Sequence, residues 1–148
     1  MVFLATVCAT ALALSLHLLR APGFTALVAV PLTGLVVMCA MGIIGRLVPR
    51  LRAQLIAIVP RSIPRPEVVV WLSAACELAA AVGLLVAPLR LASAVALALF
   101  LLGVFPANVR AAHLAGDADG TFVRRIAVRS AKQAVFIGLC VWVVVLTA

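Results

Sequence analysis

Charged residues are scarce in this chain. Only 11% of its 148 residues are Asp, Glu, Lys or Arg, whereas soluble domains contain about 25%. Hydrophobic residues make up 67% of the chain, and its mean hydropathy is +1.33. This composition excludes an ordinary soluble domain and predicts an integral membrane protein. The length leaves room for one helix bundle and no separate soluble domain.

Acidic residues are especially few, with 4 Asp and Glu against 12 Lys and Arg, for a net charge of +8. In a soluble protein that excess would suggest nucleic-acid binding. The chain contains no nucleic-acid motif, and its basic residues lie in short segments between apolar runs. Membrane topology and anionic lipid headgroups explain them better. We therefore expect the lipid bilayer, and no nucleic acid, as a partner.

The common catalytic and metal-binding patterns are also missing. The 4 cysteines form no CxxC or CxxH motif, which excludes a secreted disulfide framework. No Ser-His-Asp set, phosphate-binding glycine loop or pair of catalytic carboxylates can be assembled. His17 and His113 have no ligand-spaced partner and are predicted to be interfacial. The sequence thus predicts no metal site, names no cofactor and leaves open whether the protein is an enzyme.

Five apolar runs are candidates for membrane spans, which need about 20 residues each. They are residues 1–19, 24–45, 68–88, 91–109 and 133–148. The last run is short, so we expect it to extend back into 127–132, and 122–132 could form a short interfacial helix that leads into it. The first run could be a cleaved signal peptide, but it lacks a basic start and a clear cleavage site. The predicted fold is an all-α polytopic membrane bundle, with a helix at 1–19 and a four-helix bundle at 24–148.

The basic residues predict the orientation of these spans. Two of them, Arg20 and Arg90, would lie on the side opposite the N-terminus. The N-terminal side would hold the other ten: Arg46, Arg50, Arg52, Arg61, Arg65, Arg110, Arg124, Arg125, Arg129 and Lys132. By the positive-inside rule the N-terminus is cytoplasmic and the C-terminus is outside. Composition rich in Ala, Val and Arg is typical of GC-rich bacteria, so we expect a bacterial inner membrane.

Glu77 is the most informative residue, because it is a lone carboxylate in the middle of the run 68–88. A charge at such a depth costs roughly 2.5–3.5 kcal/mol, which makes an acid there a functional-site hypothesis. On a helix it shares a face with Ser73 and small residues that let other helices approach. Glu77 could handle protons or polarise a ligand. It could equally be a structural acid, protonated or bonded to a hydroxyl or carbonyl of another helix.

Asn108 is a second polar candidate, at the end of the run 91–109 and just after Pro106. Pro106 should interrupt the helix and free backbone carbonyls. The predicted hairpin at Pro88 places Asn108 roughly 12 Å nearer the cytoplasm than Glu77, so a direct bond between them is not expected, although water could connect them. We favour the interpretation that Pro106 kinks the helix and that Asn108 caps it at the membrane interface.

The cysteines are candidates for thiol chemistry. Cys8, Cys39, Cys76 and Cys140 all fall roughly 10–15 Å into their predicted spans. A shared layer would permit a thiol pair or a soft-metal site. Cysteine is also a common small hydrophobic residue of buried helices, and we favour that interpretation.

Several motifs follow one another in a recognisable order. They are the proline-rich segment 58–66, Ser73 with Glu77, Gly83-Leu84-Leu85, Phe105-Pro106-Ala107-Asn108, and Arg129 with Gln133. In these motifs the chain from Arg46 onward resembles the DoxX family of small bacterial membrane proteins. It departs from many members by having Ile43-Ile44-Gly45-Arg46 where they have a His, and Ser130-Ala131-Lys132 where they have a Pro.

The resemblance implies a four-helix membrane core at 24–148 with 1–19 as an extra helix. It assigns the family's characteristic acid to Glu77 and its polar cap to Asn108. Some relatives are subunits of quinone-linked, thiosulfate-oxidising complexes, and others are associated with redox or thiol stress. We therefore expect an accessory subunit of a redox or quinone-linked membrane assembly.

Two other functions remain open. The bundle could have its own pocket, in which Glu77 binds an apolar molecule such as a quinone, a lipid or a sterol-like compound. It could also be a scaffold without chemistry, whose basic segments bind an acidic membrane or peripheral protein or anionic lipid. A co-purifying small molecule would favour the pocket, and a co-purifying polypeptide would favour the subunit.

Overall fold

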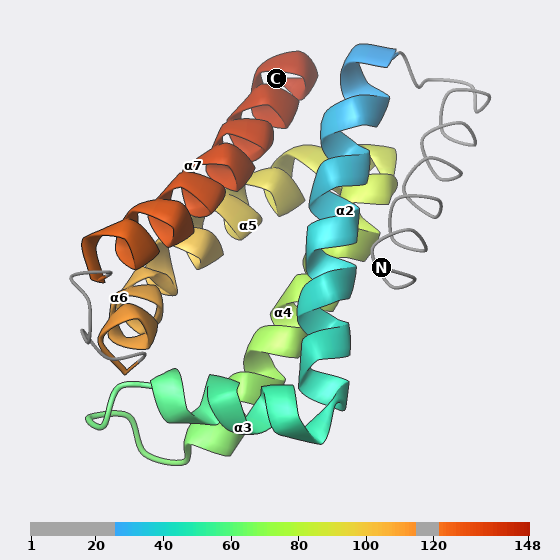
Figure 1. The fold of residues 1–148 in the computed structure, drawn as a ribbon. Helices are drawn as coiled ribbons and strands as arrows, with labels where there is room; N and C mark the ends of the chain where they lie inside the picture. Colours follow the sequence, from blue (N-terminus) through green and yellow to red (C-terminus); the bar gives the residue numbers. More distant parts are fainter. Residues whose placement is uncertain (1–25, 115–121) are drawn as a thin grey trace.

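A computed structural model describes residues 26–114 and 122–148 (Figure 1). Within these two ranges the protein is all-α, as predicted, and contains no strand. Its elements are α2 (Ala26–Leu47), α3 (Pro49–Ile58), α4 (Pro66–Leu85), the 3₁₀ turn η1 (Ala87–Leu89), α5 (Arg90–Gly103), α6 (Phe105–Leu114) and α7 (Phe122–Thr147). The predicted first span at 1–19, with Cys8, lies outside the described residues.

In the part of the chain that the structure describes, four helical segments are long and apolar enough to cross a membrane: Leu27–Leu47, Pro66–Leu85, Ala87–Leu114 and Val123–Thr147. They correspond to the last four of the five predicted runs. Many of their large apolar side chains are exposed, among them Leu27, Leu72, Leu99 and Val145. Contact with lipid explains this exposure, since acyl chains are as apolar as leucine. The described chain is a polytopic membrane helix bundle.

Prolines set several of the helix boundaries. Pro49 and Pro66 begin α3 and α4, where the missing N–H would have no helical partner in any case. Pro60 and Pro64 lie in the non-helical segment between these helices. The segment after the second predicted span is therefore a short helix followed by an irregular connection.

Helix α5 ends at Gly103 and α6 begins at Phe105, so the third candidate span is interrupted at Val104. Pro106 has no N–H to donate to the carbonyl of Leu102, and this loss favours the break that the sequence predicted. By contrast, α7 is one continuous helix from Phe122 to Thr147. The last span does begin before residue 133, and residues 122–132 belong to the same helix.

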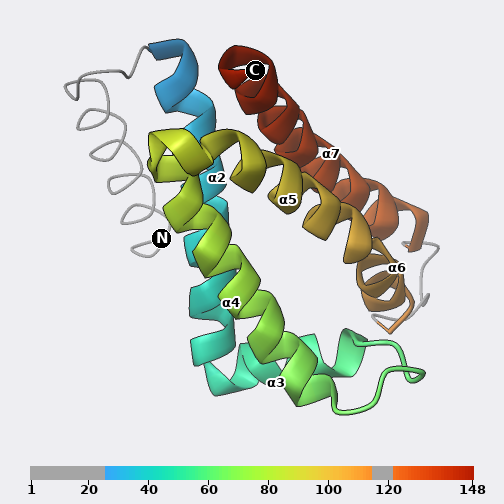
Figure 2. The ribbon, with the colours of Figure 1, turned by 180° about the vertical axis from the view of Figure 1, so that it is seen from behind.

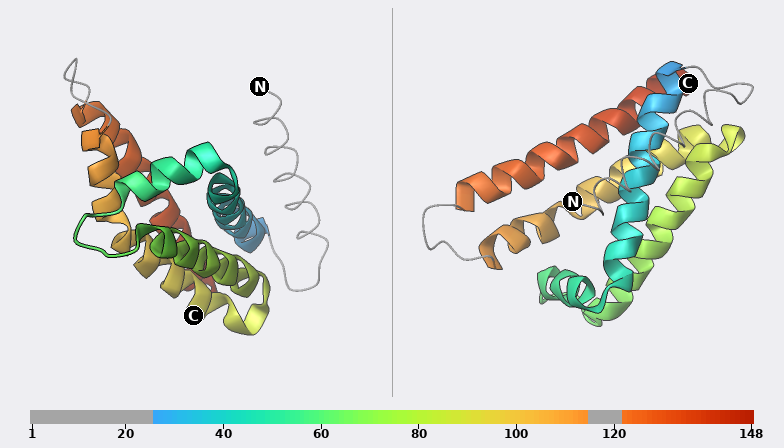
Figure 3. Two further views of the ribbon diagram at one scale, coloured as in Figure 1. Left: turned by 90° about the horizontal axis from the view of Figure 1, so that it is seen from below. Right: turned by 45° about the vertical axis from the view of Figure 1, so that its right-hand side comes forward.

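The bundle is closed at one end and wider at the other. Helix α2 packs against α4, and α5 packs against α7; α2 also contacts α7. Figures 1 and 2 show these pairs meeting near the start of α2, η1 and the C-terminus. The pairs diverge toward α3, which lies across the wider end, and Figure 3 shows the same arrangement from two other sides. The polar residues discussed below lie toward this wider end.

The closed end contains the apolar core. Its fully buried side chains include Leu32, Leu35, Leu84, Leu97 and Val143. The hairpin between α4 and α5 is tight, because a Cβ at Gly83 would overlap the side chain of Ser93. The buried Arg90 donates from Nε to the carbonyl of Leu84 at 3.0 Å, so it pairs with the C-terminal end of α4. This close packing holds the two helix pairs together at the closed end.

Candidate functional site

Glu77 forms a bidentate ion pair with Arg46. Arg46 Nη1 lies 2.8 Å from Glu77 Oε2, and Nη2 lies 3.0 Å from Oε1. The two side chains are only 9% and 12% exposed. Both carboxylate oxygens thus accept from one guanidinium, which is the strongest geometry available to such a pair. The carboxylate is directed at α2 and away from the lipid.

Helix α4 accepts two further hydrogen bonds from the Arg46 guanidinium. Nη2 also donates to Ser73 Oγ at 2.8 Å, and Nε donates to the carbonyl of Val70 at 3.0 Å. Ser73 in turn donates to Val70 at 2.8 Å. Val70, Ser73 and Glu77 are spaced by three and four residues, so they lie on one face of α4. Four hydrogen bonds from a single side chain therefore connect the end of α2 to the middle of α4.

Gly42 makes this arrangement possible. It lies one helical turn before Arg46 on α2, and a Cβ at this position would collide with Glu77 Oε2. Only a residue without a side chain lets the carboxylate approach the α2 backbone this closely. The sequence signal was present, as a glycine and an arginine spaced by four residues, but it was not interpreted as a site.

Arg46 is placed differently from its prediction. The apolar run was expected to end at Gly45, which assigned Arg46 to the basic residues outside the span. Instead α2 continues to Leu47, and Arg46 is 7% exposed. Helix boundaries predicted from hydropathy are uncertain by a few residues. Here the paired carboxylate lowers the cost of retaining the arginine in the span, because it offsets the charge.

The structure gives Glu77 a partner that the sequence did not predict. The structural alternative named a hydroxyl or a backbone carbonyl as its partner, whereas the partner is a guanidinium. Ser73, the other candidate on this face, binds the same cation. The predicted site residues Glu77 and Ser73 therefore belong to one cluster, which we call the Arg46–Glu77 cluster (Arg46, Val70, Ser73 and Glu77).

Asn108 belongs to a different polar pair. Its Nδ2 donates to Gln133 Oε1 at 2.9 Å, and Gln133 Nε2 donates to the carbonyl of Leu101. Gln133 is 7% exposed. The pair connects α7 to both sides of the α5–α6 break, where the helix ladder is interrupted. Asn108 was predicted to be an interfacial cap, but its partner is a buried side chain of the neighbouring helix.

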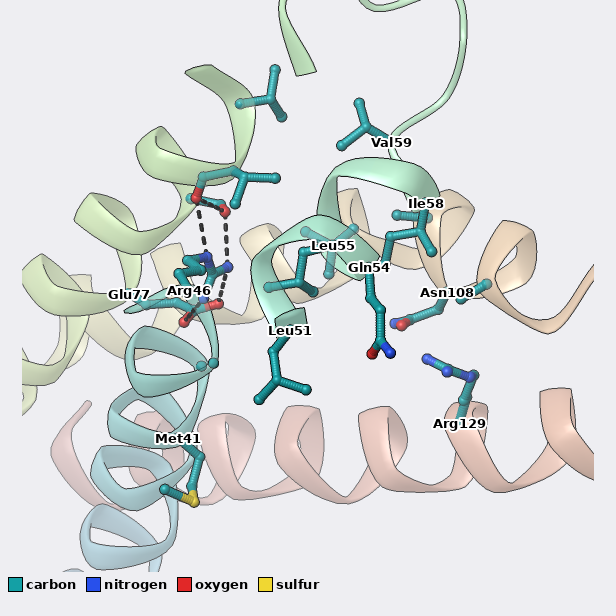
Figure 4. A pocket seen from close by; sticks show the side chains of 18 residues that line it. Met41, Arg46, Leu51, Gln54, Leu55, Ile58, Val59, Glu77, Asn108 and Arg129 are labelled. Carbon is teal, nitrogen blue, oxygen red and sulfur yellow. Dashed lines mark hydrogen bonds and ion pairs between the residues drawn. The ribbon is translucent and has the colours of Figure 1, made fainter. Parts of the chain in front are cut away.

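A pocket of about 470 Å³ lies between the Arg46–Glu77 cluster and Asn108 (Figure 4). We call it the inter-helix pocket. Its lining residues come from five helices and the segments next to them, and the apolar ones include Met41, Leu51, Leu55, Val59 and Val104. Asn108, Gln54 and Arg129 form its polar side opposite the cluster. As predicted, no direct Glu77–Asn108 bond occurs among the described residues, yet both line this one pocket.

Sequence reasoning missed three of the residues on the pocket: Arg46, Gln54 and Arg129 were not proposed as site residues. Gln54 and Arg129 lie in segments with ordinary polar spacing, at positions 49–58 and 122–132. A polar residue in such a segment is usually solvated, so nothing in their local pattern distinguishes them. Only the packing of α3 and α7 around the pocket does so.

The three cysteines among the described residues do not share one environment. Cys39 and Cys140 are buried in the apolar core, whereas Cys76 is exposed on α4. All three are free thiols. Among residues 26–114 and 122–148, no group of three His, Cys, Asp or Glu side chains could hold a metal ion. Burial among leucines is what a small hydrophobic residue would show.

One comparison with known proteins gives a match. Residues 36–147 match the model of a family described as a domain of unknown function (DUF8561). No curated protein and no solved structure matches the chain. The matched range contains all the residues of the Arg46–Glu77 cluster and of the inter-helix pocket.

Proposed function

This chain is a member of the DUF8561 family, and we propose that its bundle binds a small, largely apolar molecule in the inter-helix pocket beside Glu77. The molecule would be quinone-, lipid- or sterol-like, with oxygen atoms that accept hydrogen bonds. The observation that carries the proposal is the pocket itself, which combines apolar walls with polar groups at opposite sides.

The size and lining of the pocket support this class of ligand. A volume of about 470 Å³ falls within the range of roughly 300–1,000 Å³ that is usual for small-molecule sites. Such sites are mostly apolar with a few polar groups that fix orientation. Here the aliphatic side chains of α3 and α4 would contact the body of the ligand. The amides of Gln54 and Asn108 would orient its polar end.

The Arg46–Glu77 cluster would act as a rigid polar wall of the site. Each carboxylate oxygen of Glu77 already accepts from Arg46, so the pair presents a fixed dipole to the pocket. A preorganised group of this kind binds a ligand oxygen without first losing its own partner. A ligand that donates to Glu77 and accepts from Arg46 would match both charges. We assign no chemical reaction to the site.

Co-purification tests this proposal. Protein purified in mild detergent is extracted and searched by mass spectrometry for a stoichiometric apolar compound. We expect one in the wild type and its loss in Ala107→Phe, because the added ring would occupy the pocket that Ala107 lines. Ala79→Phe is the matched control, since Ala79 is exposed on α4 and lines neither pocket. Equal ligand content in the two variants would contradict the proposal.

An accessory role in a redox or quinone-linked assembly is the second candidate. It is supported by the resemblance to DoxX proteins, and in particular by Ser73 and Glu77, which both line the pocket. The same purification distinguishes the two functions. A partner polypeptide that co-purifies in constant ratio without any small molecule would favour the subunit over the pocket.

We propose a bacterial inner membrane as the location, with α3 on the cytoplasmic side. Two of the arginines used for this prediction have local partners, since Arg46 pairs with Glu77 and Arg90 with Leu84. Without them the basic residues still number nine on one side, against Arg20 on the other. The bias therefore does not depend on the paired arginines.

Fusions to the C-terminus test this orientation. Because α7 should end outside, alkaline phosphatase fused after Ala148 should be active and a green fluorescent protein at the same place should be dark. A second pair of fusions, inserted in the α3–α4 connection after Ser62, should give the opposite result. The reverse pattern at both sites would invert the proposed topology.

A further inference from the structure

A second pocket, of about 750 Å³, lies between the first turns of α7 and the α5–α6 break. We call it the basic pocket. Four of its lining residues are cationic: Arg124, Arg125, Arg129 and Lys132. None of its nine lining residues is acidic. The inter-helix pocket, by contrast, contains its own carboxylate in Glu77.

The positive charges of these four side chains add up to a strong positive potential in the pocket. Arg125, Arg129 and Lys132 are spaced by four and three residues, so they lie on one face of α7. Like charges at this spacing repel each other. Helix α7 also has no acidic residue in its first turn, where the backbone dipole adds further positive charge. An anion bound in this pocket would relieve the repulsion and meet several donors at once.

The apolar part of the lining indicates what kind of anion fits. Leu101, Val128 and Phe136 line the same pocket, and Val128 is about half exposed. The candidate span Val123–Thr147 has 25 residues, about 37 Å of helix, whereas the hydrocarbon layer is about 30 Å thick. The extra length and the four cations together favour a position of the first turns of α7 at headgroup level, with the apolar residues next to acyl chains. A soluble anion would use only the basic half of such a site.

We propose that the basic pocket binds an anionic phospholipid, with its phosphate among Arg124, Arg129 and Lys132 and an acyl chain along Val128 and Phe136. Basic pockets between membrane helices on the cytoplasmic side are suited to such headgroups. Asn108 and Arg129 line this pocket and the inter-helix pocket alike. The bound lipid would therefore adjoin the ligand site without being its ligand.

Native mass spectrometry of the full chain tests the proposal. Detergent-purified protein is titrated with phosphatidylglycerol or phosphatidylcholine, and the bound lipids are counted. We expect one phosphatidylglycerol to bind at least tenfold more tightly than phosphatidylcholine. Arg124→Gln/Lys132→Gln should weaken phosphatidylglycerol binding by roughly 25-fold, since each basic residue near an anionic surface contributes about fivefold. Both residues line only the basic pocket, so the inter-helix pocket stays unchanged.

The matched control is Arg50→Gln/Arg61→Gln, which removes the same charge from exposed positions on α3 and the connection after it. This variant should retain wild-type phosphatidylglycerol binding. An equal loss in both double variants would overturn the proposal, because only bulk charge would then matter. Displacement of the lipid by millimolar inorganic phosphate, or equal binding of glycerol phosphate, would overturn it in favour of a free phosphate. The Arg124→Gln/Lys132→Gln variant should still contain the apolar compound of the inter-helix pocket. Loss of phosphatidylglycerol binding can therefore be distinguished from a failure of the proposed function.

Discussion

Replacing Glu77 with glutamine is expected to lower the free energy of unfolding by about 3–5 kcal/mol, because it leaves the buried Arg46 without a counter-charge. The amide can still accept a hydrogen bond, but it provides no negative charge and only one acceptor oxygen. Thermal unfolding of the purified protein in detergent, followed by circular dichroism, measures the effect. The yield of membrane-inserted protein should fall in parallel.

The double variant Arg46→Gln/Glu77→Gln separates charge pairing from shape. It removes both charges, and a buried pair replaced as a unit costs much less than a pair broken on one side. We expect it to recover most of the lost stability, with a coupling energy well above the value for an exposed pair. Glu67→Gln is the control, because Glu67 is an exposed acid at the start of the same helix. If Glu77→Gln is as stable as Glu67→Gln, the ion pair does not hold α2 to α4.

Replacing Gly42 with alanine is the second change with a large expected effect. The added Cβ cannot be accommodated next to Glu77 Oε2, so the carboxylate must move away from Arg46 or α2 must move away from α4. Overpacking of this kind costs about 1–3 kcal/mol. Loss of the bidentate geometry would add to that cost. We expect a lower unfolding temperature together with loss of the co-purifying apolar compound.

Gly138→Ala is a control for which we expect the opposite change in stability. A Cβ at Gly138 on α7 meets nothing within 4 Å, and this residue lines neither pocket. Alanine is favoured over glycine within a helix by roughly 0.5–1 kcal/mol. This variant should therefore be slightly more stable than the wild type. If Gly42→Ala is also stabilising, the close approach of α2 to the Glu77 carboxylate is not a constraint on the fold.

The helices were largely predictable because their signal is local. Run length and hydropathy identified the four candidate spans of the described chain, and Pro106 indicated where the third is interrupted. The errors were at boundaries, where charged residues belong to a helix rather than to its flanks. Arg46 and the start of α7 are both examples.

The candidate site was predictable only in part. Glu77 stood out because an isolated carboxylate in an apolar run is costly wherever the helix faces, and Ser73 followed from helical spacing. Asn108 was assigned to a cap, because Gln133 is 25 residues away in the sequence and no local pattern relates the two. Gln54 and Arg129 could not be found in this way. Each has an ordinary local context and borders the pocket only because α3 and α7 pack around it.

Composition and hydropathy by themselves determined that this protein is an all-α membrane bundle containing one costly acid, since the transfer of side chains into lipid depends mainly on the residues of each span. The tertiary structure decided which residues meet: Arg46 with Glu77, Asn108 with Gln133, and five helices around one pocket. The physical reason is that lipid is as apolar as the helix surfaces, so hydropathy indicates insertion but not which face of a helix packs against its neighbour. That choice depends on close packing, as at Gly42, and on hydrogen bonds between residues far apart in the chain.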